Sequence, residues 1–245
     1  TVMYHRYLNI KKEDPKWEDR DRFILSKGHA GIAYAPVLCD FGYNDPEQLK
    51  TFNLTNSKMG IHLDSNKVAG VDASTGSLGH GIPIAAGTAI AARVLGKDYY
   101  TYVVTGDGEL DEGSNWEGLM TIRHYNLTNC ITIVDRNHCM IDGNTEDVMK
   151  LEPLADKFVA FGFHTIVCEG NNIVSLCKAI DEAHKTKDKP TVIVADTIKG
   201  VGIKLTSGNY KWHYGAIDEE MAKVAAKDLD EYSAERIARC GKEFE

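Results

Sequence analysis

The sequence lacks the features that would assign it to a membrane or to nucleic acid. Its apolar runs are far shorter than the roughly 20 residues that a membrane-spanning helix needs, and we expect no signal peptide. The net charge is −8, and no dense group of lysines and arginines offsets it locally, which argues against a nucleic-acid-binding surface. A phosphorylated ligand would therefore have to be held by local features, since no positive field covers the whole molecule.

Cysteines are few and scattered. None of the six lies in a Cys-x-x-Cys pair. Cys130 and Cys168 fall in strand-like apolar runs, where a free thiol acts as a small hydrophobic side chain. The pattern predicts no disulfide bonds and a reducing, cytoplasmic compartment.

The length and the order of the elements predict an α/β fold. A chain of 245 residues can bury a sizeable core, as one large α/β domain or as two small ones. Short apolar runs alternate with helix-like segments without an internal repeat, which predicts a parallel sheet with helices on both faces. We expect a single domain over residues 1–245, with a core at about residues 19–216 and a charged helical tail at residues 217–245.

Residues 99–143 carry the strongest local pattern. Two apolar runs, at residues 99–104 and 130–134, are short, β-branched and uninterrupted. Such runs are typical of strands buried on both faces of a parallel sheet. A helix-like block at residues 116–125 separates them. The stretch therefore predicts a βαβ unit whose two strands point the same way.

Polar and glycine residues follow both of these strands. Because the carboxyl ends of parallel strands share one edge of the sheet, Asp107 and Asn137 are expected at the edge where α/β sheets bind ligands. Their oxygens suit a hard divalent cation, and Gly106 and Gly108 open the backbone to a bulky anion. Each motif alone is also typical of an ordinary turn, but the two together predict a metal-diphosphate site.

The same stretch resembles the thiamine diphosphate motif, in which GDG precedes an asparagine at a similar distance. GDGELDEGSNWEG resembles the transketolase version, GDG-x-x-x-EG-x-x-WE, and VDRNHCMIDG resembles its D-x-N-x-x-x-IDG. The resemblance to transketolases runs from Asp19 to about Ala216. It implies the thiamine diphosphate-binding fold, with thiamine diphosphate and Mg²⁺ (or Ca²⁺) as cofactors.

The resemblance also implies a metal-ligand set. Asp107 and Asn137 would be side-chain ligands, and Cys139 would contribute its backbone carbonyl. The Cys139 sulfur is not implied, because a thiolate is the wrong donor for Mg²⁺ or Ca²⁺. The other cofactor contacts that the resemblance implies in this stretch are Gly106, Gly108, Glu109 and Ile141.

A second block, TGSLGHG at residues 75–81, precedes an alanine-rich helix-like segment at residues 83–95. It resembles transketolase TGPLGQG, which implies that the loop at Gly76, Ser77 and Leu78 meets the aminopyrimidine ring. Ser77 stands where the family has proline, and His80 stands where it has glutamine. These departures concern the rigidity of the loop and its partner contacts, not the class of coenzyme.

Three histidines match active-site positions of the family. DRFILSKGHA resembles DRF-x-LS-x-GHA and implies that His29 lies near the diphosphate and the reacting sugar. Weaker matches assign His62 to the substrate and His213 to the active site and the cofactor. Histidine titrates near neutral pH, so these side chains suit proton exchange with sugar hydroxyls. Glu112 matches a residue placed at the subunit interface, near the activating acid.

No segment of the sequence resembles the second domain of transketolases, which binds the pyrimidine ring and carries the glutamate that activates the coenzyme. We therefore expect a two-chain enzyme in which a partner chain supplies that domain and that glutamate, as a heterotetramer.

The implied reaction moves a two-carbon ketol unit from a phosphorylated or sulfonated ketose to an aldose phosphate. Two alternatives are the alpha subunit of another thiamine diphosphate enzyme, such as a 2-oxo acid dehydrogenase, and a non-catalytic protein that binds a Mg-diphosphate compound.

Overall fold

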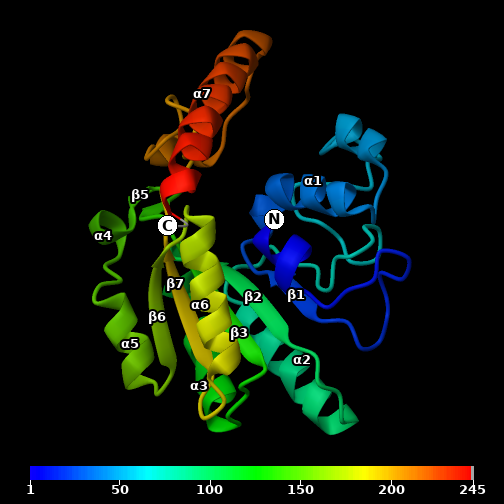
Figure 1. The fold of residues 1–245 in the computed structure, drawn as a ribbon, viewed down its shortest axis with the longest axis vertical. Coiled ribbons are helices and arrows are strands. Elements are labelled where there is room, and N and C mark those ends of the chain that lie inside the picture. Colours follow the sequence, from blue (N-terminus) through cyan, green and yellow to red (C-terminus); the bar gives the residue numbers. More distant parts are fainter. Residues whose placement is uncertain (244–245) are drawn as a thin grey trace.

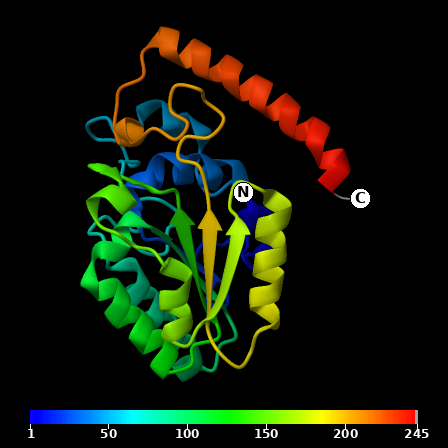
Figure 2. The ribbon, with the colours of Figure 1, turned by 90° about the vertical axis from the view of Figure 1, so that its left-hand side faces the viewer.

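The computed structural model describes residues 1–243, with side chains described up to residue 238. A parallel sheet of five strands, in the order β1-β2-β3-β7-β6, lies between two layers of helices (Figures 1 and 2). The strands are β1 (Arg22–Leu25), β2 (Thr101–Gly106), β3 (Cys130–Arg136), β6 (His164–Glu169) and β7 (Thr191–Asp196). The predicted fold class is thus confirmed.

Alternate residues of each central strand point to opposite faces, and both faces are buried. On one face, α1 (Gly31–Phe41) and α6 (Ile173–Lys185) belong to the same hydrophobic cluster as Tyr102 and Ile131. On the other face, a separate cluster joins Val103 and Val134 to three helices, α2 (Gly81–Leu95), α3 (Gly113–His124) and α5 (Leu154–Ala160). Burial on both sides explains why these strands read as continuous apolar runs.

The parallel pairing of β2 with β3 sets the position of the predicted site. Gly106, the last residue of β2, lies opposite Asp135 of β3. Asp107 and Asn137 therefore follow the carboxyl ends of two neighbouring strands, as expected. A short antiparallel pair, β4 (Cys139–Met140) and β5 (Gly143–Asn144), and the small helix α4 (Thr145–Val148) continue from this edge.

The start of α3 differs from the expectation of a helix from residue 116. The helix begins at Gly113, directly after the turn η4 (Gly108–Asp111). Its first turn, Gly-Ser-Asn, consists of weak helix formers. Tertiary hydrogen bonds hold it, because the Asn115 amide donates to the Glu109 carbonyl at 2.5 Å and the Trp116 indole donates to the Leu110 carbonyl at 2.8 Å.

The start of α5 differs as well, because Pro153 caps the helix and Leu154 is its first residue. A residue before proline is pushed out of the helical region, so residues 151 and 152 stay outside. The N-terminal segment also packs: within η1 (Met3–Tyr7), Met3 and Tyr4 join the cluster that contains α1, although residues 1–18 show no sequence pattern.

Helix α7 (Glu219–Glu243) lies beyond the carboxyl edge of the sheet, and most of its described side chains are exposed (Figure 2). In the part of the chain that the structure describes, no helix is long and apolar enough to cross a membrane. Five cysteines are free, namely Cys39, Cys130, Cys139, Cys168 and Cys177, and Cys240 lies outside the described side chains.

Candidate functional site

A cavity of about 380 Å³ opens at the carboxyl edge of the sheet, above β2 and β3. Loops that are far apart in sequence meet here. Twelve of the fourteen predicted site residues line it: His29, Gly76, Leu78, Gly106, Asp107, Gly108, Glu109, Glu112, Asn137, Cys139, Ile141 and His213. Ser77 and His62 are not among the lining residues.

His62 nevertheless lies against the Gly76 loop. A Cβ placed on Gly76 would lie 2.8 Å from Cδ2 of the His62 ring, and Gly76 has a φ of +152°. Only glycine fits this combination of backbone conformation and close contact. Ser77 stays in the same loop, where its carbonyl lies 3.2 Å from Nδ1 of His80.

Asp107 is the most buried acid of the cavity, with an exposed fraction of 1%. One carboxylate oxygen accepts a hydrogen bond from the Gly108 amide at 2.8 Å, and the other accepts one from the His138 amide at 2.7 Å. Arg136 lies 3.1 Å from the second oxygen. Burial raises the pKa of Asp107 above its ordinary value, and these three donors limit the rise.

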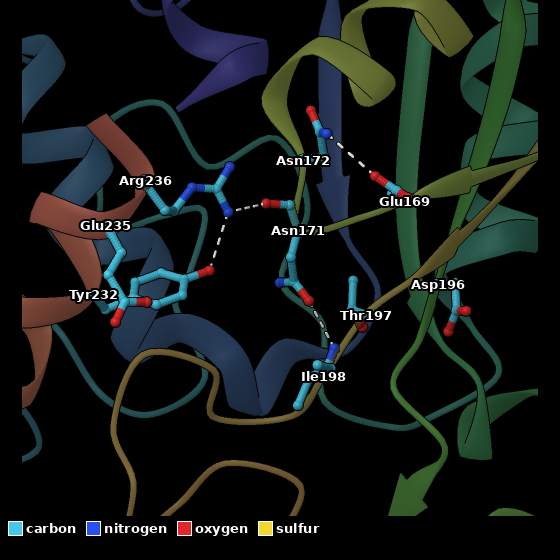
Figure 3. Close-up of a pocket in the computed structure, with 9 residues that line it drawn as sticks. All are labelled: Glu169, Asn171, Asn172, Asp196, Thr197, Ile198, Tyr232, Glu235 and Arg236. Carbon is cyan, nitrogen blue, oxygen red and sulfur yellow. Dashed lines mark hydrogen bonds between the residues drawn. The ribbon is translucent and has the colours of Figure 1, made fainter. Parts of the chain in front are cut away.

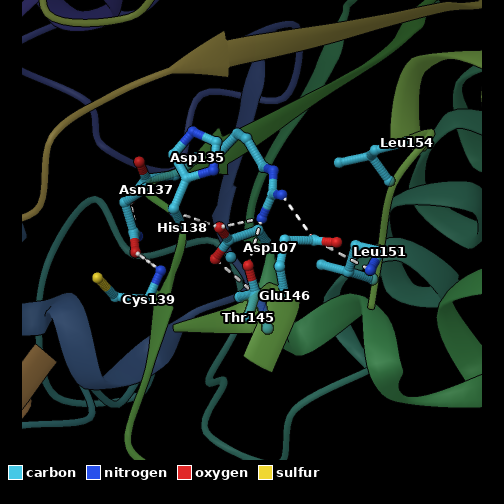
Figure 4. Close-up of polar contacts among 12 residues, drawn as sticks. Asp107, Asp135, Asn137, His138, Cys139, Thr145, Glu146, Leu151 and Leu154 are labelled. Carbon is cyan, nitrogen blue, oxygen red and sulfur yellow. Dashed lines mark hydrogen bonds and ion pairs between the residues drawn. The ribbon is translucent and has the colours of Figure 1, made fainter. Parts of the chain in front are cut away.

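Arg136 is the buried centre of an ion-pair network that sequence reasoning missed (Figure 4). It contacts Asp107, Glu146 at 2.8 Å and Glu152 at 2.9 Å, and it also donates to the Thr145 hydroxyl. One guanidinium thus faces three carboxylates. The excess of negative charge beside Asp107 favours a further cation at this edge.

The turn after β3 brings the other predicted metal ligands next to Asp107. His138 has a left-handed φ of 61°, which is uncommon outside glycine. Asn137 Oδ1 accepts from the Cys139 amide at 3.1 Å, while its Nδ2 donates to Asp135 at 3.2 Å. Burial raises the pKa of the Cys139 thiol, so sulfur stays protonated and is a poor ligand.

The donors here fit a hard cation whose coordination is completed by a ligand. Asp107 and Asn137 present oxygen atoms, which Mg²⁺ and Ca²⁺ prefer. Among the described residues, no group of three or more His, Cys, Asp and Glu side chains could hold a metal by itself. Mg²⁺ sites of this kind take one or two protein carboxylates plus phosphate oxygens, so the residues fit a metal that arrives with a diphosphate.

Two lysines in the cavity, Lys27 and Lys199, were missed as site residues. Lys27 Nζ lies 2.6 Å from Asp135 Oδ2. Lys199 is half-buried, and burial together with the charge of Lys27 lowers its pKa. Lys27 lies within the SKGHA motif and Lys199 in an expected hinge after β7, so a positive charge near each was the available signal. Together they form a local positive corner in an acidic protein.

His29 and His213 form a pair beside these lysines. Their ring centroids are 4.9 Å apart. Burial, with a further contribution from Lys27, lowers the pKa of His29 to about 4. Burial and Lys199 also lower the pKa of His213, and its buried Nδ1 has no hydrogen-bond partner in the described structure. Both rings are neutral at pH 7, and one of them has a ring nitrogen available to a ligand.

The remaining predicted residues lie at the rim. Ile141 is 63% exposed and Leu78 is 36% exposed. Glu112, the N-cap of α3, is also exposed. An apolar rim with an exposed acid suits contact with a ligand ring or with another chain.

A second cavity, of about 320 Å³, lies at the same edge above β6 and β7, below α7 (Figure 3). Its polar groups contact one another. Arg236 donates to the Tyr232 hydroxyl at 3.0 Å and to the Asn171 carbonyl, and Asn171 Oδ1 accepts from the Ile198 amide at 2.7 Å. Asn172 caps α6 and donates to Glu169. These contacts seat α7.

The fold and the first cavity define a class of protein: an α/β domain whose sheet edge presents oxygen donors, glycine turns and lysines to a metal-diphosphate group. The chain belongs to the transketolase family. The family model that describes the transketolase thiamine diphosphate binding domain matches residues 1–233.

Two similar proteins are named as subunits of transketolases. The first of the two named subunits of apulose-4-phosphate transketolase from Actinobacillus succinogenes is 39% identical over 229 residues, which cover 94% of this chain and 83% of that protein. The 6-deoxy-6-sulfo-D-fructose transketolase subunit SqwG of a Clostridium species is 37% identical, over 96% of this chain and 85% of that protein. The family that the motifs predicted is confirmed.

Solved transketolases share the fold. The Campylobacter jejuni enzyme superposes with a TM-score of 0.88 at 31% identity, over 94% of this chain and 37% of that one. The Leishmania mexicana enzyme superposes with a TM-score of 0.80 at 33% identity, over 97% of this chain and 40% of that one. The chain therefore spans well under half of the solved transketolase chains that it matches.

Proposed function

We propose that this chain is the cofactor-binding subunit of a two-chain transketolase, and that it works in the reducing cytoplasm. A partner chain would supply the pyrimidine-binding domain and the activating glutamate, in a heterotetramer. Two observations support the proposal: the two relatives described above are named subunits of transketolases, and Glu112, Leu78 and Ile141 are exposed at the rim of the cavity.

The diphosphate half of thiamine diphosphate would bind at the buried end of the cavity. Asp107, Asn137 and the Cys139 carbonyl would hold Mg²⁺ (or Ca²⁺) against it. Lys27 and Lys199 add positive charge, and the lowered pKa of Lys199 means that an anion there gains a cation that lacks compensation. The Gly106 and Gly108 turn leaves room for the anion, because neither residue carries a side chain.

The ring half would lie toward the rim, between Leu78 and Ile141, with Gly76 beneath it. When bound, thiamine diphosphate supplies the electron sink that makes cleavage of a carbon–carbon bond possible. This chain's residues hold it, orient it and keep water away from its buried half.

His29, His62 and His213 would handle the sugar. Neutral imidazoles can accept or donate hydrogen bonds at the hydroxyl groups of a ketose. The low pKa of His29 keeps it neutral well below pH 7, so it can accept a proton from a hydroxyl without first losing one.

The substrates we propose are a ketose with an anionic end, either phosphate or sulfonate, and an aldose phosphate. Apulose-4-phosphate and 6-deoxy-6-sulfo-D-fructose appear in the names of the relatives. Both are ketose derivatives with an anionic group at one end. The family match favours this function over that of a 2-oxo acid dehydrogenase.

The single observation that carries the proposal is the convergence of Asp107, Asn137, Gly76, His29 and His213 on one cavity. Calorimetric titration tests it, with thiamine diphosphate plus Mg²⁺ as ligand, ADP plus Mg²⁺ as control, and each titration repeated with the candidate partner chain. Selective binding of thiamine diphosphate that strengthens with the partner is expected. Equal binding of ADP, or no binding of either ligand with the partner present, would overturn the proposal.

A further inference from the structure

Glu109 is a buried carboxylate directly after the Gly106-Asp107-Gly108 turn, with an exposed fraction of 3%. Among the described residues, no lysine, arginine or histidine forms an ion pair with it. A buried charge without a counter-charge is unfavourable unless hydrogen bonds stabilise it. The donors around Glu109 therefore identify what this side chain does.

Four donors surround the carboxylate. Oε1 accepts from the Ser26 hydroxyl and from the Gly79 amide, the latter at 3.0 Å. Oε2 accepts from the Thr105 hydroxyl at 2.8 Å and from the Gly106 amide at 3.1 Å. Each oxygen thus takes one hydroxyl and one backbone N–H.

These donors belong to three segments that line the cofactor cavity. Ser26 precedes Lys27, Gly79 follows Leu78, and Thr105 and Gly106 precede Asp107. One carboxylate therefore ties the lysine–histidine loop, the ring-side loop and the diphosphate-side turn to one another.

The arrangement requires a carboxylate rather than an amide. The Gly79 and Gly106 amides can only donate, and they bond to different oxygens. A glutamine at this position has a single oxygen, so its NH₂ group would face one of the two backbone N–H groups. One buried backbone donor would then be left without an acceptor.

We propose that Glu109 is a positioning residue that sets the spacing between the ring-side loop and the diphosphate-side turn, and that it acts through these loops rather than by contact with the cofactor. The inference rests on the proposed function, because it assumes that one ligand spans both loops. Thiamine diphosphate spans them, whereas pyrophosphate reaches only the diphosphate side.

The test compares Glu109→Gln with Glu117→Gln, which makes the same chemical change at an exposed position of α3. Binding is measured by calorimetry for thiamine diphosphate plus Mg²⁺ and for pyrophosphate plus Mg²⁺. We expect E109Q to weaken thiamine diphosphate binding by about 10- to 100-fold and pyrophosphate binding by much less. E117Q should match the wild-type chain for both ligands.

A milder variant covers the case in which E109Q does not fold. Thr105→Val keeps the shape of the side chain and removes one donor, so it should show the same selective loss at smaller size. Equal weakening of both ligands would mean a general structural role and would overturn the inference. Unchanged thiamine diphosphate binding in E109Q or T105V would overturn it as well, whereas absence of binding by the wild-type chain would contradict the proposed function instead.

Discussion

Two cavities of similar size lie at the carboxyl edge of one sheet, and they differ in how their polar groups are used. In the cavity above β6 and β7, Asn171, Asn172 and Tyr232 make hydrogen bonds within the protein (Figure 3). In the cavity above β2 and β3, Lys199 and Nδ1 of His213 face the space without a compensating protein group. A position at the sheet edge is therefore not sufficient to make a binding site. Polar groups that the fold leaves unsatisfied distinguish the binding cavity from the structural one.

The largest expected effect comes from Asp107. We expect Asp107→Ala to weaken thiamine diphosphate and Mg²⁺ binding by about 100-fold or more, because it removes the only carboxylate among the proposed metal ligands. The fold should survive, since Arg136 keeps its contacts with Glu146 and Glu152. Calorimetry measures the loss, and circular dichroism checks the fold.

Glu235→Gln in the other cavity is the matched control for Asp107→Ala. Its cofactor affinity should equal that of the wild-type chain. Weakening of similar size in both variants would remove the distinction between the two cavities.

A smaller effect is expected from Lys199. Lys199→Met should weaken binding of the diphosphate by about 10-fold, because a half-buried cation beside the anion is lost. The dependence of affinity on salt concentration should also decrease. Lys211→Met, at an exposed lysine further along the same loop, should leave both the affinity and its salt dependence unchanged. Identical salt dependence in K199M and the wild-type chain would argue against contact with the anion.

Asn171→Ala probes the structural cavity. It removes the acceptor of the Ile198 amide, so we expect a loss of about 1 kcal/mol in the free energy of unfolding. Hydrogen exchange should speed up in α7 and in the segment after β7. Thiamine diphosphate affinity should not change, and a large decrease in affinity would show that the two cavities are coupled.

The smallest effect concerns pH. Burial lowers the pKa of His29 from its ordinary 6.5 to about 4. Between these values the unfolded chain binds a proton that the folded chain does not, so stability rises with pH across this window and falls as the solution is acidified. His29→Asn should flatten the rise in melting temperature between pH 4 and pH 6.5. His124→Asn, at the exposed end of α3, should retain the wild-type slope.

Several features of the site could be predicted because they depend on order along the chain. The apolar runs at β2 and β3, each followed by a polar turn, were enough to place Asp107 and Asn137 at one sheet edge. The glycine-rich loop before α2 was identified in the same way. The roles of Arg136 and Lys199 were not predictable, because each depends on partners that come from other strands and loops.

The sequence by itself determined the fold class, the family and the position of the diphosphate turn, because the periodicity of apolar residues and the spacing of glycines are local properties of the chain. Only the tertiary structure decided which charges meet. It joined Ser26, Gly79 and Gly106 on the Glu109 carboxylate, and it left Lys199 facing the cavity. Electrostatic and hydrogen-bond partners depend on distance in space rather than distance along the chain.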